Sequence, residues 1–407
     1  MKRQSPVPSA AILLAVAMFL ALAAGNILTP LLPLIQDDFS ITYAVAGILV
    51  SAFGFARLVL DLPTGYLQER FGARTLSAAG FAFLIGGSVL STAAPVFGVL
   101  VAGRVLMGLG ASMLSVVVLT ALSALAPENA RARTMALYAM ANNSAIGIFP
   151  VVGGIVGSLW GWRSTMALSG VLAAVGAVLM GRILARVPEN RDIREEAADA
   201  DRRTSGLPVA LLVALGTIYF GVAVTMINRH GFRNTILPLF AGDAIGLNPV
   251  QTATGISVMA VVGLLVAMPG GMLADRWSRR GVISAGMLVL AIGDLAFLGA
   301  SSYATFLLAS LVLGFGDFFA ASQMAAVSEA VPAHSRGRVL AAYRFSVDIG
   351  ATIGPFFLAS LLGMTGFNTT IVVGAGLLLV SSIVVQLGGL VTRGRRTPTH
   401  QPVAESR

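Results

Sequence analysis

Long apolar stretches alternate with short polar breaks along the whole of this 407-residue chain. Each stretch has roughly 20 residues or more, the length at which an α-helix crosses the ~30 Å hydrocarbon core of a bilayer. The first stretch is too long for the apolar part of a cleaved signal peptide and no small-residue cleavage site stands out, so we expect it to be a span. The pattern predicts twelve spans, over residues 10–35, 43–67, 76–94, 97–125, 134–158, 164–186, 207–240, 249–273, 282–300, 303–330, 338–362 and 368–391.

Polar, glycine and proline landmarks recur at a nearly constant offset. Pro33 and Pro238 lie 205 residues apart, as do Pro150 and Pro355, whereas the segments GYLQER and GMLADR are 206 apart, which one inserted residue explains. Chance similarity between apolar segments is the alternative, but the shared residues are the non-aliphatic ones. The repeat predicts a six-span half (1–186), a cytoplasmic linker (187–206), a second six-span half (207–391) and a cytoplasmic tail (392–407).

The composition excludes an ordinary soluble domain. Hydrophobic residues make up 56% of the chain and charged residues only 11%, whereas soluble domains carry about 25% charged residues. Cysteine is absent, so disulfides are excluded and the redox compartment is not indicated. The predicted fold class is therefore an all-α membrane protein.

Positive charge is distributed unevenly over the breaks. Alternate breaks are basic, and the intervening ones hold a single arginine, Arg163. Because basic loops stay cytoplasmic during insertion, both termini are predicted to face the cytoplasm, across a bacterial inner membrane. The net charge of +9 then reflects topology, and dispersed arginines argue against nucleic-acid binding.

The segment GYLQERFGAR, between the second and third spans, resembles the loop motif G-x-L-a-D-R-x-G-R-R of the major facilitator superfamily, and GMLADRWSRR is its second-half copy. The resemblance covers essentially the whole chain, although Glu69 stands for the family's Asp and Ser278 for a glycine. It implies two pseudo-symmetric six-helix bundles working by alternating access, with the loop carboxylate gating against the eleventh span. The alternative is that these arginines only set topology. The loop residues assigned to gating are Gly65, Glu69, Arg70, Gly72, Arg74, Gly271, Asp275 and Arg276.

Charged residues within spans usually face a bundle interior or a wet cavity. Arg57 and Asp61 are four apart on the second span, and Arg344 and Asp348 are four apart on the eleventh, so each pair shares a helix face. In the resembled fold these spans touch. We therefore expect a four-residue interdomain network that rearranges during transport, against the alternative of two private pairs.

The remaining charges lie mostly on spans that line the cavity of the resembled fold. Arg229 and Arg233 are one helical turn apart, with His230 offset by about 100°, and Gly231 and Pro238 weaken regular helix there. A second interpretation, snorkelling of the arginines to the headgroups, stays open. The predicted cavity residues are Asn26, Arg104, Arg229, His230, Arg233 and Asp317.

Coupling to protons requires a group that changes protonation. Asp317 and His230 are the candidates. Asp294, on the peripheral ninth span, is predicted to be a structural carboxylate. No metal site is predicted.

The fifth span bears on the branch of the family. Drug–proton antiporters of the superfamily carry G-x-x-x-G-P-x-x-G-G there, and this chain keeps only the second half of that motif; the eleventh span keeps another part. Close helix packing is the alternative role. The residues concerned are Pro150, Gly153, Gly154, Gly350, Gly354 and Pro355.

The sequence favours a secondary active transporter, with proton-coupled efflux of a small organic compound or drug as the leading hypothesis. A proton-linked transporter of an organic anion is the rival, and a membrane receptor without transport is the alternative from another class. An enzyme is not expected, because cysteine is absent and the three histidines form no metal or triad pattern. No Walker-type loop or cofactor motif occurs. The expected partners are a small-molecule substrate, protons and lipid, and the expected state is a monomer.

Overall fold

The computed structural model describes residues 8–126, 131–185, 209–331 and 336–393, and within them every regular element is helical. This confirms the all-α class. The elements are α1 (Ser9–Ala21), α2 (Ala23–Asn26), η1 (Thr29–Leu31), α3 (Leu32–Phe39), α4 (Tyr43–Thr92), α5 (Phe97–Leu125), α6 (Arg131–Leu184), α8 (Val209–Met226), η3 (Ile227–Ile236), α9 (Leu237–Leu239), η4 (Phe240–Ala244), α10 (Pro249–Arg276), α11 (Arg279–Ala296), η5 (Phe297–Gly299), α12 (Tyr303–Phe315), η6 (Gly316–Phe319), α13 (Ala320–Glu329) and α14 (Arg336–Arg393).

Ten helices of the described residues are long and apolar enough to cross a membrane. Two of them, over residues 137–184 and 339–388, have 48 and 50 residues, far more than one crossing needs. Each contains a glycine with non-helical dihedrals, Gly161 in α6 and Gly366 in α14. The number of crossings predicted from the sequence, twelve, therefore stays a prediction.

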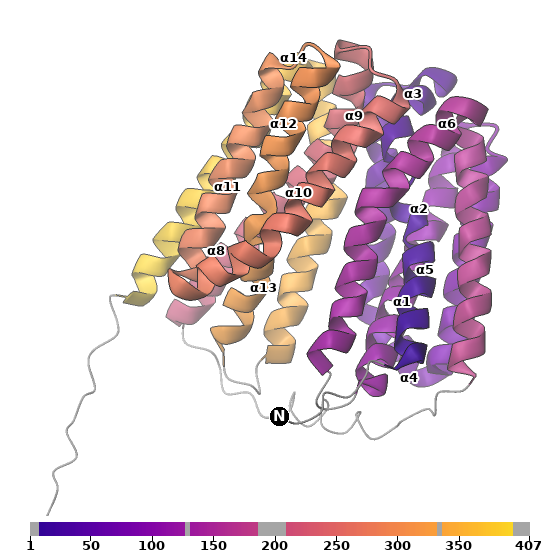
Figure 1. Cartoon of the computed structure of the whole chain (residues 1–407), viewed down its shortest axis with the longest axis horizontal. Coiled ribbons are helices and arrows are strands. Elements are labelled where there is room, and N and C mark those ends of the chain that lie inside the picture. The colour runs from indigo at the N-terminus through magenta and orange to yellow at the C-terminus, as the bar shows by residue number, and fades with distance from the viewer. Residues whose placement is uncertain (1–7, 127–130, 186–208, 332–335, 394–407) are drawn as a thin grey trace, which may run out of the picture.

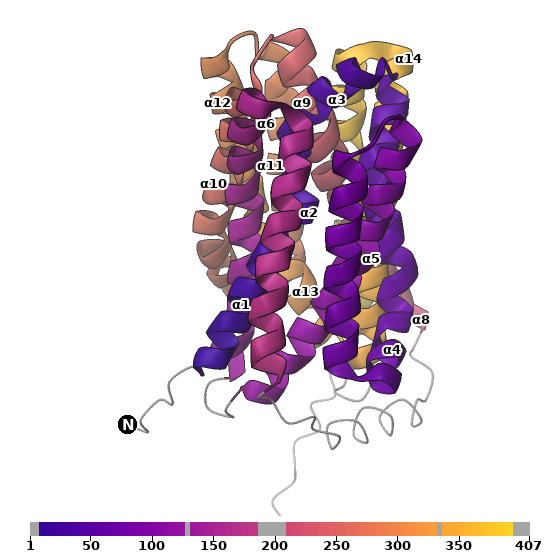
Figure 2. The same ribbon diagram turned by 90° about the vertical axis from the view of Figure 1, so that its right-hand side faces the viewer.

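The helices stand side by side in two groups (Figures 1 and 2). Helices α1 to α6 form one group and α8 to α14 the other; we call them the N-half and the C-half. The start of α1 and the end of α14 lie at the same end of the molecule, drawn at the bottom of Figure 1, which we call the lower end. Large apolar side chains such as Leu265, Met268 and Met364 are exposed on the outside, as expected for surfaces that meet lipid rather than water.

Turns between antiparallel helices use glycine where the backbone requires it. Gly72, Gly161 and Gly366 have φ near +80°, a conformation essentially restricted to glycine when ψ is close to 180°. Gly161 and Gly366 are separated by the 205-residue repeat. Ser278 occupies the place equivalent to Gly72; it has φ −156° and accepts a hydrogen bond from the Gly281 N–H at the start of α11. The loss of the motif glycine there is thus accompanied by a helix cap.

The two halves are held together at the upper end. The Tyr43 hydroxyl of α4 donates to the Asp243 carboxylate of η4 over 2.9 Å, and the Ser51 hydroxyl accepts from the Phe356 N–H over 3.1 Å. A Cβ added to Gly54 would lie 2.9 Å from the Ala351 carbonyl oxygen, so α4 and α14 approach backbone to backbone. Toward the lower end, Gly65 has no such neighbour within 4 Å.

The first and seventh spans depart from regular α-helix. The first, predicted as one stretch over 10–35, is a series of short helical pieces with a 3-10 turn over Thr29–Leu31, where Pro30 lacks an N–H. The seventh continues from α8 as two π-helical segments, η3 and η4. Gly231, expected to weaken this helix, packs against α14: a Cβ there would lie 2.6 Å from the Gly354 carbonyl oxygen.

Candidate functional site

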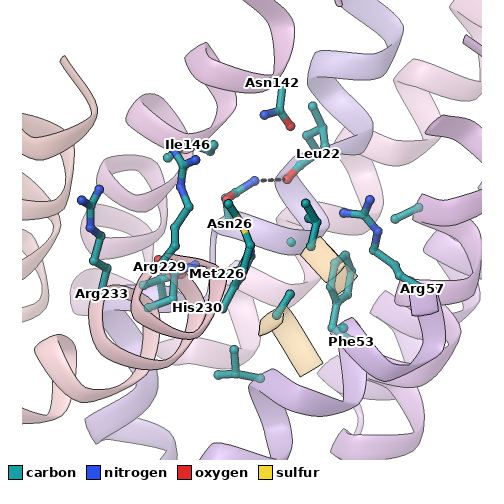
Figure 3. Close-up of a pocket in the computed structure, with 18 of the residues that line it drawn as sticks. Leu22, Asn26, Phe53, Arg57, Asn142, Ile146, Met226, Arg229, His230 and Arg233 are labelled. Atoms are coloured by element: carbon teal, nitrogen blue, oxygen red, sulfur yellow. Dashed lines mark hydrogen bonds between the residues drawn. The ribbon is translucent and has the colours of Figure 1, made fainter. Parts of the chain in front are cut away.

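A cavity of about 370 Å³ lies between the two halves (Figure 3). We call it the central chamber. Its volume falls within the usual range for small-molecule sites. The N-half contributes the polar side chains Asn26, Arg57, Arg104, Tyr138 and Asn142, and the C-half contributes Arg229, His230, Arg233, Asn234, Asp317, Tyr343 and Asp348. All six cavity residues predicted from the sequence are among the lining residues.

Arg233 and Asp317 form a buried ion pair at the wall of the chamber. The Arg233 Nη1 donates to Asp317 Oδ2 over 2.6 Å and Nη2 to Oδ1 over 3.3 Å. The Nη2 also donates to the Leu313 carbonyl oxygen. The two side chains are only 8% and 12% exposed, so the fork-like contact is largely shielded from solvent. Arg233 therefore does not reach headgroups.

Arg229 and His230 also line the chamber, and they lie nearer its middle than Arg233 does. Figure 3 shows Arg229 extending into the chamber toward Ile146, while Arg57 approaches from the opposite half. Within the described residues Arg229 makes no hydrogen bond or ion pair, although its charge acts on Asp317 and His230. It is the chamber arginine best placed to meet a ligand.

The π-helical geometry of η3 distributes these side chains. Hydrogen bonds from residue i to i+5 replace the usual i to i+4 pattern, which brings residues five apart to similar sides of the helix. Asn228 and Arg233 consequently both point into the C-half, where they bind Asp294 and Asp317. Arg229 and His230 face the chamber instead.

Arg104 of α5 is part of the chamber wall but is 2% exposed. Its Nη1 donates to the Ala24 carbonyl oxygen over 2.5 Å, and its guanidinium carbon lies 4.7 Å from the centre of the Phe53 ring. These contacts join α5 to α2 and α4 by a hydrogen bond and a cation–π interaction. Asn26 is similarly occupied, donating to the Leu22 carbonyl oxygen over 3.0 Å.

The four charges predicted to form an interdomain network lie close to one another. Arg57 and Asp61 are 3.9 Å apart on α4, and Asp61 also accepts a hydrogen bond from Ser112. The Asp348 carboxyl of α14 interacts electrostatically with Arg57 and Asp61 of the N-half and with Arg344. The structure thus brings together the carboxyl groups of both halves beside one arginine.

The loop residues lie at the lower end. Arg74 donates to the Leu184 and Ala185 carbonyl oxygens, each over 2.8 Å, and so occupies the carboxyl end of α6. Arg70 lies over the Phe71 ring. Asp275 forms an ion pair with Arg279 over 2.9 Å. Glu69 and Arg276 are exposed, and Gly271, like Gly65, has open space around it.

The residues of the fifth and eleventh spans lie at helix contacts. Added Cβ atoms at Gly153 and Gly350 would meet the carbonyl oxygens of Ile27 and Ala223, within the N-half and C-half respectively. One at Gly154 would lie 2.7 Å from the Pro249 carbonyl oxygen, across the two halves. Gly354 contacts η3 at Ile227. Pro150 and Pro355 lie inside α6 and α14.

Several lining residues were not predicted from the sequence. Asn142, Asn234, Tyr138 and Tyr343 are uncharged and carry no motif that marks them. Tyr138 and Tyr343 are related by the 205-residue repeat, and that symmetry is the signal that would have placed both in a central cavity.

Comparison with known proteins gives a consistent result. The family model described as Major Facilitator Superfamily matches residues 14–232 and 218–406. The MFS-type transporter YcaD of Escherichia coli strain SE11 is 29% identical over 348 residues, which cover 84% of this chain and 85% of that protein. The MFS-type transporter MJ1560 of Methanocaldococcus jannaschii is 21% identical, covering 86% of this chain and 91% of that protein.

Solved structures resemble the fold over nearly its full length. A bacterial homologue of the human lysosomal transporter Spinster, in an inward-facing and unoccupied conformation, has a TM-score of 0.81 at 14% identity, covering 96% of this chain and 98% of that one. The peptide transporter POT in complex with sulfate has a TM-score of 0.77 at 13% identity, covering 96% and 97%. At such identities the likeness concerns the fold alone.

Proposed function

Because the chain belongs to the Major Facilitator Superfamily and is thereby a multi-pass membrane transporter, we propose that it moves a small organic anion through the central chamber by alternating access. The transport is proton-linked and the protein acts as a monomer in the bacterial inner membrane. The lower end, with its basic loops, faces the cytoplasm. The two halves correspond to the repeat, with two crossings in each of the two longest helices, which gives twelve in all.

The observation that carries the anionic substrate is the charge of the chamber. Its walls hold four arginines and two aspartates, and the buried pair of Arg233 with Asp317 cancels one charge of each sign. Arg229 has no ion-pair partner in the described part of the chain. An unpaired cation is costly inside the membrane, so a bound anionic group would stabilise it.

The remaining wall of the chamber suits the apolar body of such a substrate. Phe53, Ile146, Met226, Ile256 and Met259 line it. Apolar walls with a few fixed polar groups are typical of small-molecule sites, in which the polar groups orient the ligand. An aromatic sulfonate or carboxylate fits this combination.

Alternating access requires the halves to separate at one end and close at the other. The contacts of Tyr43, Ser51 and Gly54 with the C-half would open in the opposite state. The charges of Arg57, Asp61, Arg344 and Asp348, placed where α4 meets α14, would exchange partners as this happens.

Proton-coupled efflux of a drug is the second candidate. The observation in its favour is the half of the antiporter motif that the fifth span retains, in which Gly154 packs against α10 of the other half. A cationic drug, unlike an anion, would be repelled by the charge of Arg229, and a neutral drug would gain at most a hydrogen bond from it.

Uptake by proteoliposomes tests the two candidates. Benzenesulfonate stays ionised at all working pH values and so does not cross the bilayer as a neutral acid; phenyltrimethylammonium, which has the same ring and a fixed positive charge, is the matched cationic probe. We expect counterflow of benzenesulfonate, with KM raised about 10- to 100-fold in Arg229→Gln, as for a lost hydrogen-bonded charge contact of about 1.5–3 kcal/mol.

Arg163→Gln is the matched control, because this arginine lies outside the chamber beside Asp38. Transport of phenyltrimethylammonium alone, or an unchanged KM in Arg229→Gln, would contradict the anionic substrate.

A further inference from the structure

A buried carboxyl outside the central chamber is the strongest unassigned feature of the molecule. Asp294 of α11 is 0% exposed, and its Oδ2 lies 2.5 Å from Asn228 Nδ2 of η3. Asn228 is itself 3% exposed. Phe232 and Phe297 pack against each other close by in the chain, and Gly374 of α14 approaches the carboxyl without adding a polar side chain.

The Asn228 NH₂ group donates to Asp294 Oδ2, but this leaves two neighbouring oxygens without a donor. Asp294 Oδ1 and Asn228 Oδ1 are both buried acceptors without any hydrogen-bond donor. Leaving one such group unpaired costs about 1–3 kcal/mol, and more when it is charged. A proton on the Asp294 carboxyl removes the charge and supplies the missing donor.

A protonated carboxyl also has an acceptor in this contact. Because an amide side chain can present either its oxygen or its NH₂ group, a protonated Asp294 can donate to Asn228.

A metal ion is a poorer occupant than a proton. Biological metal cations of the hard type take several oxygen ligands, whereas this pocket offers two unpaired oxygens. Among the described residues there is no group of three or more His, Cys, Asp or Glu side chains that could hold a metal.

Resting on the proposed function, we propose that Asp294 is the proton-binding group of this transporter, and that its protonation sets whether Arg229 is available to the anion. The ion pair of Asp317 with Arg233 leaves Asp317 without a free role as the primary proton site. Asp294 instead takes that role, from a position behind the wall of the chamber.

The link runs through Arg233. Its charge is the one that acts on Asp294 within the described residues, no charged side chain facing the carboxyl from α14. Its Nε is buried and unpaired. Asp294 releases its proton to water on the side of the membrane to which the chamber is open. The charged carboxylate then attracts the Arg233 guanidinium and can accept a hydrogen bond from its free Nε–H.

Asp317 then loses its closest partner. Arg229 is the other arginine whose charge acts on Asp317, and it lies one turn from Arg233 on η3. Pairing of Arg229 with Asp317 would make this guanidinium unavailable to an anion in the chamber. Anion and proton are therefore expected to bind together and to be released together.

Infrared spectra of the wild type and of variants test whether Asp294 carries a proton, and this measurement needs no substrate. Protein reconstituted in liposomes at neutral pH should show the carbonyl band of a protonated carboxylic acid. We expect the band to be lost in Asp294→Asn and kept in the double variant Arg233→Met/Asp317→Leu, which removes both members of the buried ion pair. A spectrum unchanged by Asp294→Asn would overturn the proposal.

Transport of benzenesulfonate tests the coupling. In Asp294→Asn, accumulation driven by a pH gradient should be lost and the pH dependence of counterflow should disappear, because the amide imitates the protonated acid at every pH. Ser284→Ala, on the same helix and bonded to Ser382, is the control and should keep both. Accumulation driven by pH in Asp294→Asn, or by a sodium gradient in the wild type, would overturn the proposal.

Failure of the proposed function can be distinguished from failure of the proton site, because the two give different results. If wild-type protein shows no counterflow of benzenesulfonate, the anionic substrate is wrong while the infrared result still decides the proton. Asn228→Ala keeps the carboxyl and removes its partner, and should shift the pH of half-maximal accumulation by at least one unit. An unshifted profile would contradict the role of the amide.

Discussion

Arg233 and Asp317 show how a charge can be placed inside a membrane protein without being free to act. The guanidinium and the carboxylate satisfy each other through two hydrogen bonds, while Arg229, one turn away on η3, has none with any residue that the structure describes. Two arginines on one helix thus differ in role: Arg233 stabilises the structure through its ion pair, and Arg229 faces the chamber.

Asp317→Asn is expected to destabilise the protein strongly, because Arg233 would stay buried without a counter-charge. Removing one partner of a buried pair costs about 3–5 kcal/mol, whereas replacing both by apolar residues is often nearly neutral. Thermal unfolding in detergent should therefore show a large loss for Asp317→Asn and a much smaller one for the double variant Arg233→Met/Asp317→Leu.

The pair of Arg163 and Asp38 is the control for this comparison. Its side chains are 44% and 41% exposed, and exposed pairs contribute about 0–1 kcal/mol. Equal losses from Asp38→Asn and Asp317→Asn would contradict the distinction between buried and exposed pairs.

At the scale of single residues, the sequence predicts which side chains line the chamber better than it predicts their binding partners. A charged or polar residue within an apolar stretch is visible in the chain, and the six residues predicted in this way line the chamber, while their role in transport stays a prediction. Which arginine meets Asp317 depends on how η3 packs on η6, and the uncharged Asn142 and Asn234 give no signal. Asp294 was predicted to be structural because its helix is peripheral; its partner Asn228 is an ordinary polar residue in the sequence.

Among the elements, the seventh span shows where local pattern stops being informative. Gly231 and Pro238 indicated an irregular helix, and the structure has two π-helical segments instead of a break. A π turn takes up one residue more than an α turn, and η4 lies within the interval where the repeat offset grows from 205 to 206. Helix packing across the C-half, which a single sequence does not display, decides between a break and a π turn.

The helix joints give a prediction that depends on backbone alone. Gly161 has φ +80° and ψ 164°, with no neighbour within 4 Å of an added Cβ. Gly161→Ala should therefore destabilise by about 1–3 kcal/mol through its dihedrals and not through a clash. Thermal unfolding measures this.

Gly181→Ala is the matched control, since it lies in the same element with equally open surroundings and ordinary dihedrals. It should be neutral or stabilising by up to about 1 kcal/mol. A similar loss in both variants would show that the dihedral is not the cause.

The contact of α14 with α8 gives the opposite case. A Cβ at Gly350 would overlap the Ala223 carbonyl oxygen and lie 2.6 Å from Met226 Cβ. Gly350→Ala should cost about 1–3 kcal/mol because the helices must move apart, whereas Gly216→Ala on α8, with nothing within 4 Å, should not. Thermal unfolding again checks the pair, and an unchanged Gly350→Ala would contradict the close approach.

For the whole molecule, the all-α class followed from the length and spacing of the apolar stretches, because these are one-dimensional properties of the chain, while the bounds of the two halves stay a prediction. The conformation did not follow, since the sequence is the same in every state of the transport cycle. The contacts between the two halves at the upper end identify the structure as a state in which that end is closed.

A disulfide between the halves tests whether they must separate. A Cβ at Gly147 of α6 would lie 3.6 Å from the Ala260 Cβ of α10, within the range of about 3.5–4.5 Å found in disulfides. The chain has no cysteine of its own, so Gly147→Cys/Ala260→Cys would form one defined bond. Oxidation should abolish counterflow of benzenesulfonate and reduction should restore it; full activity of the oxidised protein would show that α6 and α10 stay together.

The anion proposed to bind Arg229, which has no ion-pair partner among the described residues, also bears on how the transporter responds to voltage. A monoanion crossing alone gains or loses about 2.3 kcal/mol for every 100 mV of membrane potential. If each anion travels with the proton of Asp294, the cargo is electrically silent, and potassium diffusion potentials set with valinomycin should leave the accumulation ratio unchanged. Such a carrier would keep working in a depolarised cell as long as its surroundings remain acidic.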